Sequence, residues 1–124
     1  MTITTDRAGP ALQVELLWFD ECPNHAAARG LLSDALGELA PATAIDDINA
    51  TDPAVALLHR FPGSPTIRIN GGDVDPAFRD PGDYTPRCRL YWTSDGLRGL
   101  PERAWIDAAL RVAIADQSGR ITAG

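Results

Sequence analysis

Cys22 and His25 are the residues whose types and spacing first point to a reactive site. They lie in the segment WFDECPNH at residues 18–25, between an apolar run and an amphipathic stretch. The apolar run predicts a buried strand, and Pro23 suits the first helical position, where its missing N–H would be unpaired anyway. Cys22 is then expected at the helix N-cap, where unpaired N–H donors and partial positive charge favour a thiolate. This predicts Cys22 as a nucleophile or soft-metal ligand, while His25 either assists the thiolate, shuttles a proton or faces solvent.

His25 stands where a Cys-x-x-Cys motif would carry its second cysteine, so a second thiol must come from elsewhere in the chain. The only other cysteine is Cys88. Two acidic neighbours oppose ionisation of Cys22, and the alternative for this residue is a small, inert apolar side chain. Cys88 lies between two arginines, which favour its thiolate, and the long loop before it could fold back over Cys22. The alternative for Cys88 is a strand cysteine that faces the core.

Hydrophobic periodicity and turn residues predict the elements that position these side chains. Strands and helices alternate in the first half of the chain, which favours parallel pairing through right-handed crossovers. An Asn-Gly-Gly-Asp turn predicts a hairpin, and a long polar loop at 76–87 precedes the last helix. In the short second helix, Leu58 is expected to face the core. We expect flexible ends at 1–11 and 116–124 around one domain at 12–115. The predicted strands cover residues 12–19, 43–48, 66–69, 73–75 and 88–93, and the predicted helices cover 23–39, 54–60 and 101–115.

Length and composition limit the classes of function. A chain of 124 residues is expected to form one domain with a modest core. The formal net charge of −6 and the scattered Lys and Arg residues disfavour nucleic-acid binding. The first ten residues lack the apolar run of a secretory signal, and no apolar run approaches the roughly 20 residues that cross a bilayer. We therefore expect a cytoplasmic protein without a membrane or nucleic-acid partner and without a cofactor, and its oligomeric state stays open.

The predicted order β-α-β-α-β-β-α, a Cys-Pro pair before the first helix and a Ser-Pro-Thr before the third strand together resemble the thioredoxin fold. That fold is an α/β structure with a central mixed sheet flanked by helices. The resemblance implies a cis bond before Pro65, which is an uncommon state, and places Pro65 beside Cys22. It also implies that Pro23, Ser64 and Thr66 help Pro65 to bind substrate. More narrowly, the chain is similar to small bacterial thioredoxin-like proteins labelled "thioredoxin family" or "alkylmercury lyase", on the segments Cys22-Pro23-Asn24-His25, Gly63-Ser64-Pro65-Thr66, Asp73-Val74-Asp75-Pro76 and Cys88-Arg89-Leu90-Tyr91.

These features give three hypotheses about function. The first is a thiol–disulfide oxidoreductase in which Cys22 attacks a disulfide or oxidised thiol of a protein or small molecule, and Cys88 or an external thiol resolves the mixed disulfide. The second is binding or processing of a soft metal or organomercurial by Cys22 and Cys88, with Asp20 as proton donor, because two thiolates suit a soft ion of low coordination number. The third is a non-catalytic thioredoxin-fold module that holds a peptide or partner in a groove between Cys22 and Pro65.

Overall fold

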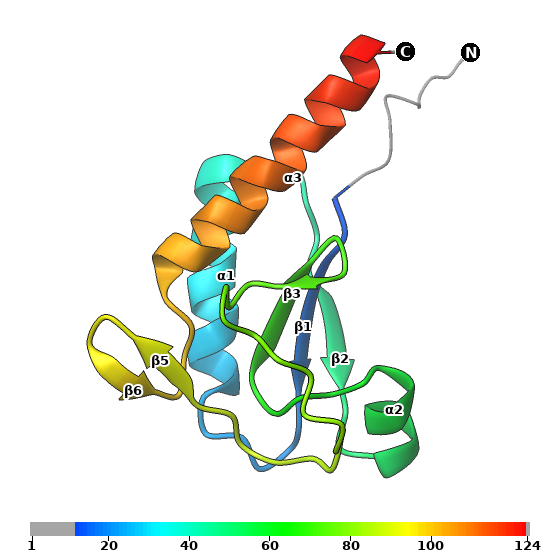
Figure 1. Cartoon of the computed structure of the whole chain (residues 1–124), viewed down its shortest axis with the longest axis vertical. Coiled ribbons are helices and arrows are strands. Elements are labelled where there is room, and N and C mark those ends of the chain that lie inside the picture. The colour runs from blue at the N-terminus through cyan, green and yellow to red at the C-terminus, as the bar shows by residue number, and fades with distance from the viewer. Residues whose placement is uncertain (1–11, 124) are drawn as a thin grey trace.

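A four-stranded mixed sheet forms the centre of the molecule (Figure 1). The computed structural model describes residues 12–123, with side chains described up to residue 117. Strand β1 (Val14–Trp18) pairs in parallel with β2 (Asp46–Asn49) and antiparallel with β3 (Thr66–Ile69), which pairs antiparallel with β4 (Gly72–Asp73). The strand order is therefore β2-β1-β3-β4, with β1 and β3 inside the sheet.

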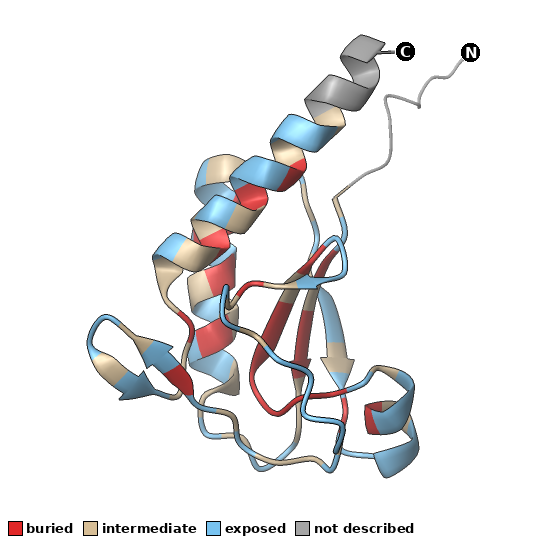
Figure 2. Cartoon of the chain, in the orientation of Figure 1, coloured by how far each residue is buried: buried red, intermediate tan, exposed pale blue. Residues whose placement is uncertain are grey.

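Helices cover both faces of this sheet, which is why β1 is apolar at successive positions rather than at every second one. Helix α1 (His25–Leu39) and helix α3 (Arg103–Ala123) pack on one face, where Leu16, Leu32 and Ile106 belong to the main core. The short helix α2 (Pro53–Leu58) lies on the other face and forms a smaller core with Leu17 and Phe61. Figure 2 shows that the buried residues lie on β1, on β3 and on the helix surfaces turned toward them.

A two-stranded hairpin of β5 (Tyr91–Thr93) and β6 (Gly96–Arg98) forms a separate sheet. The extended segment that contains β5 was predicted from the sequence, but its pairing with β6 was not. The hairpin lies beside the start of α1 in space, because Gly99 approaches the side chain of Asn24. In the chain it stands between the long loop after β4 and the start of α3 (Figure 1).

The structure confirms an α/β fold with a mixed sheet and corrects several predicted boundaries. Strand β3 has the predicted limits, whereas α1 begins at His25 rather than at residue 23. Helix α3 begins at Arg103 and continues to Ala123, so the predicted helix end at residue 115 is too early. The prediction for 1–11 lies outside the described residues. None of the helices within residues 12–123 combines the length and the apolar character required to cross a membrane.

Candidate functional site

Cys22 lies half-buried in the turn between β1 and α1. Its N–H donates to the carbonyl of Phe19 at 3.0 Å, which closes this turn before the helix starts. The N-cap is Asn24, whose carbonyl accepts from the N–H of Ala28 at 2.9 Å, so the predicted N-cap position of Cys22 is wrong. Cys22 therefore lies two residues before the N-cap, outside the terminal turn in which the helix dipole acts.

His25 packs its ring on Trp18, with 3.8 Å between the ring centroids and 12° between the planes. Its Nε2 lies 3.7 Å from Asp47 Oδ1, but Asp47 already accepts from Trp18 Nε1 and pairs with Arg29. Burial and, to a lesser extent, the charge of Arg29 lower the pKa of His25 from 6.5. This shift favours the neutral imidazole, which argues against a charged His25 that stabilises a thiolate at Cys22. In this structure His25 fixes the start of α1 against β1 and β2.

The peptide bond between Ser64 and Pro65 is cis, as the resemblance implied. Thr66, the first residue of β3, pairs with Leu17 near the end of β1. Pro65 immediately precedes Thr66 and therefore lies at the end of β1 from which the turn of Cys22 starts. Ser64, Pro65 and Thr66 are all fully buried, so they present no surface to a substrate. Figure 2 shows this buried run continuing from β3 into the preceding loop. In this structure the predicted substrate contacts through these three side chains are therefore covered.

Residues 87–91, here called the strap, cover the cis-proline loop. The N–H of Ser64 donates to the carbonyl of Arg87 at 2.8 Å, and the N–H of Arg89 donates to the carbonyl of Ser64 at 2.8 Å. These two bonds form a parallel bridge between Ser64 and Cys88. The exposed Cys88 thus lies beside the residue that precedes the cis bond. Of the two interpretations of Cys88, the structure contradicts the one in which it faces the core.

The side chain of Arg89 anchors the strap in the interior. It makes a two-pronged ion pair with Asp73, with N–O distances of 2.7 and 3.0 Å, and donates to Thr66 Oγ1 at 2.9 Å. Its guanidinium also lies 4.3 Å from the ring centroid of Tyr91. Burial raises the pKa of Tyr91, and its protonated hydroxyl donates to the carbonyl of Pro65. The strap is therefore held through both its backbone and its buried side chains.

This anchor was not predicted from the sequence, and the effect of the two arginine charges on Cys88 was misjudged. Arg89 is paired with Asp73 and Arg87 lies 3.6 Å from Asp83, so carboxylates offset both charges that were expected to favour a thiolate at Cys88. The sequence offered one signal for this ion pair, because two of the motifs quoted above carry opposite charges at Asp73 and Arg89. Nothing in their spacing of 16 residues indicates contact.

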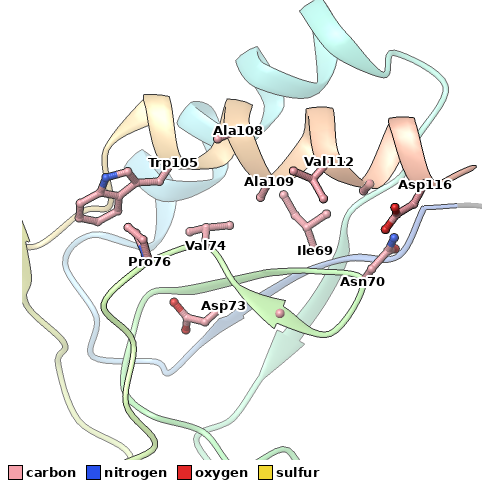
Figure 3. A pocket seen from close by; sticks show the side chains of 12 residues that line it. Ile69, Asn70, Asp73, Val74, Pro76, Trp105, Ala108, Ala109, Val112 and Asp116 are labelled. Atoms are coloured by element: carbon pink, nitrogen blue, oxygen red, sulfur yellow. The ribbon is translucent and has the colours of Figure 1, made fainter.

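A groove of about 470 Å³ lies between α3 and the turn that joins β3 to β4 (Figure 3). Its walls are mostly apolar, with Trp105 and Val112 on the helix and Ile69 on the sheet. Neither cysteine lines this groove, so it is separate from the thiol site.

The structure brings the segments of Cys22 and Cys88 to the same end of the sheet. The turn after β1 and the strap both run along the lower end of the molecule in Figure 1. Within residues 12–123, no group of three or more histidine, cysteine or acidic side chains is placed to hold a metal ion. Comparison of the chain with protein-family models, with curated proteins and with solved structures found no match.

Proposed function

We propose that the chain is a thioredoxin-like thiol–disulfide exchange protein in which Cys22 is the attacking thiol and Cys88 resolves the mixed disulfide. The observation that carries this proposal is the bridge between Ser64 and Cys88, which brings the second thiol to the end of β1 where the turn of Cys22 begins. The sheet order β2-β1-β3-β4, the strand directions and the cis bond before Pro65 support the thioredoxin-like fold.

The assignment of roles follows from burial and from the local backbone. Cys22 lies in a short turn held by its own N–H, whereas Cys88 is exposed on the strap. A thiol in a fixed turn suits the attacking role, because its approach to a sulfur atom is restricted in advance. The proposed reaction assigns no step to His25, because its ring packs on Trp18 and its Nε2 is turned toward Asp47 Oδ1 at 3.7 Å.

The exchange proceeds in two steps. The Cys22 thiolate attacks one sulfur of a substrate disulfide, so that a bond to Cys22 forms, the substrate S–S bond breaks, and the departing thiolate takes a proton from water. The Cys88 thiolate then attacks the sulfur of Cys22, which forms a Cys22–Cys88 disulfide and releases the second substrate thiol. The substrate gains two electrons that the two protein thiols lose. An external thiol or dithiol returns the protein to its reduced form.

Mass spectrometry of the protein treated with glutathione disulfide tests this scheme. We expect the wild type to accumulate the internal Cys22–Cys88 disulfide. Cys88→Ser should instead trap glutathione on Cys22, because the resolving thiol is missing. Cys22→Ser should react more slowly, and only at Cys88.

Two results would reject the proposal. One is a Cys22→Ser variant that reacts as fast as the wild type, because Cys22 would then not be the attacking thiol. The other is a wild type that carries glutathione on Cys22 without ever forming the internal disulfide. That second result would leave an external thiol as the resolving group.

A further inference from the structure

The segment from Cys88 to Trp92 turns one face to the interior and the other to solvent. Arg89 and Tyr91 point inward, with Tyr91 fully buried, whereas Cys88 is exposed, Leu90 is 60% exposed and Trp92 is 76% exposed. Alternate side chains of an extended chain lie on the same face. Cys88, Leu90 and Trp92 therefore lie next to one another on one outward face of the segment.

The β5–β6 hairpin widens this face. Trp92 is the cross-strand partner of Leu97, which is 44% exposed, and directly opposed residues of an antiparallel pair lie on the same face of the sheet. We call Cys88, Leu90, Trp92 and Leu97 together the docking stripe. Single exposed apolar residues are ordinary on protein surfaces, but a contiguous patch that starts at a thiol indicates a binding surface.

The backbone at Cys88 offers hydrogen bonds on the side away from the sheet. The bridge to Ser64 uses the carbonyl of Arg87 and the N–H of Arg89, so the N–H and carbonyl of Cys88 itself point to the opposite edge. Neither group has a hydrogen-bond partner within residues 12–123. An unpaired strand edge takes an added strand, whose main chain supplies the complementary groups.

The exposed area favours a transient partner over a stable dimer. Large apolar side chains each present on the order of 200 Å² when fully exposed, so the three apolar members of the docking stripe present roughly 350 Å². Stable complexes bury about 800 Å² on each partner, and transient encounters bury less. A small area next to a thiol suits a substrate that binds, exchanges and leaves.

We infer that the docking stripe binds an extended, cysteine-containing segment of a partner polypeptide. The segment adds as a strand along the free edge at Cys88, and its alternate apolar side chains lie against Leu90 and Trp92. The edge beside Ser64 is closed to such a segment, because the strap already occupies it. This inference relies on the proposed function for the exchange step only, since docking itself requires no reactive thiol.

A pair of disulfide probes with the same leaving group tests the inference. The first is a short peptide with a central cysteine joined to 2-mercaptoethanol and with Val or Phe at alternate positions. The second is bis(2-hydroxyethyl) disulfide, which is too small to reach the stripe. We expect Leu90→Ser combined with Trp92→Ser to slow exchange with the peptide by about tenfold or more. Exchange with the small disulfide should change less than about twofold, because it uses only the thiols.

The matched control is Leu58→Ser, which removes a side chain that is 77% exposed on α2 and outside the docking stripe. This variant should leave both rates unchanged. A peptide of the same composition with its apolar residues placed consecutively should react no faster than the small disulfide. The inference is overturned if the double variant slows both probes equally, or if both peptides react alike.

A binding measurement separates this inference from the proposed function. Fluorescence anisotropy of the labelled peptide, with serine in place of cysteine, is measured on the Cys22→Ser/Cys88→Ser protein. Saturable binding that Trp92→Ser abolishes supports the docking stripe even if no exchange occurs. Absence of saturable binding overturns it even if glutathione disulfide is reduced. A concentration-dependent dimer that Trp92→Ser abolishes also overturns it, because the occupant would then be a second copy of the chain.

Discussion

Replacing Asp73 by asparagine tests whether the ion pair with Arg89 holds the strap in solution. The side chains of Arg89 and Asp73 are only 9% and 3% exposed, and asparagine has nearly the same shape as aspartate, so the variant removes charge without opening a cavity. Removing one partner of a buried pair costs about 3–5 kcal/mol, because the other charge is left uncompensated. Asp75 lies 3.8 Å from the guanidinium and retains part of the attraction, so we expect a loss of about 3 kcal/mol.

Urea denaturation followed by circular dichroism measures this loss as a change in the free energy of unfolding. The change is a large part of the roughly 5–15 kcal/mol that stabilises a domain, and corresponds to a fall in Tm of roughly 10 °C. Asp83→Asn is the control, since the ion pair of Asp83 with Arg87 is exposed, and this variant should leave the free energy of unfolding nearly unchanged. Combining Asp73→Asn with Arg89→Met should cost less than the sum of the single changes, because no unpaired charge remains. Equal effects of Asp73→Asn and Asp83→Asn would refute the reasoning.

Three further changes test local features of the fold. Gly63→Ala should lower the free energy of unfolding by about 3 kcal/mol, because Gly63 has φ of 124° and an added Cβ would lie 2.9 Å from Arg89 Cβ. Gly71→Ala, at φ of 84° with open space, should cost only about 1 kcal/mol, and equal losses would argue against close packing of the strap. The folded pKa of His25 is lowered, so the unfolded chain binds its proton first and stability should fall as the pH drops through about 6.5. His25→Phe, which keeps a ring on Trp18, should lose that component, and parallel curves of unfolding free energy against pH would contradict it. Asp52→Ala removes the side chain that accepts from the N–H of Ala54 and should cost about 1 kcal/mol in urea denaturation, whereas Asp52→Asn should cost less.

Local sequence patterns predicted an element correctly where the residues that determine its limits lie within one short segment. The limits of β3 follow from a β-branched run between Pro65 and an Asn-Gly turn. The end of α3 was placed too early, because polar residues after Ala115 were taken as fraying. No proline follows there, and Gly119 alone costs only about 1 kcal/mol in a helix that is already formed.

Sequence patterns did not predict burial or ion pairing correctly where these depend on residues far apart in the chain. Leu58 was expected to face the core, but it is exposed, because Ala56 and Phe61 fill the small core beneath a helix of six residues. Such a short helix gives no reliable period from which to choose the inward face. The anchor between Asp73 and Arg89 could not be predicted either, since only the folded backbone brings the two side chains together. For the candidate site, the resemblance to the thioredoxin fold implied the cis bond before Pro65, but no signal in the sequence indicated the strap that covers it.

The stack of Trp18 on His25 has a consequence for the thiol that lies between them in sequence. The two rings join the ends of the six residues 19–24, so Cys22 is carried by a closed loop whose base is clamped on β1 and α1. Such a loop has few conformations to lose when it meets a substrate, and this lowers the entropic cost of reaching a reactive geometry. Separating the two rings would let the Cys22 sulfur move farther from the sheet, but the sulfur would then sample many orientations. The position of Cys22 is therefore set by β1 and α1, which hold the two stacked rings, rather than by the turn itself.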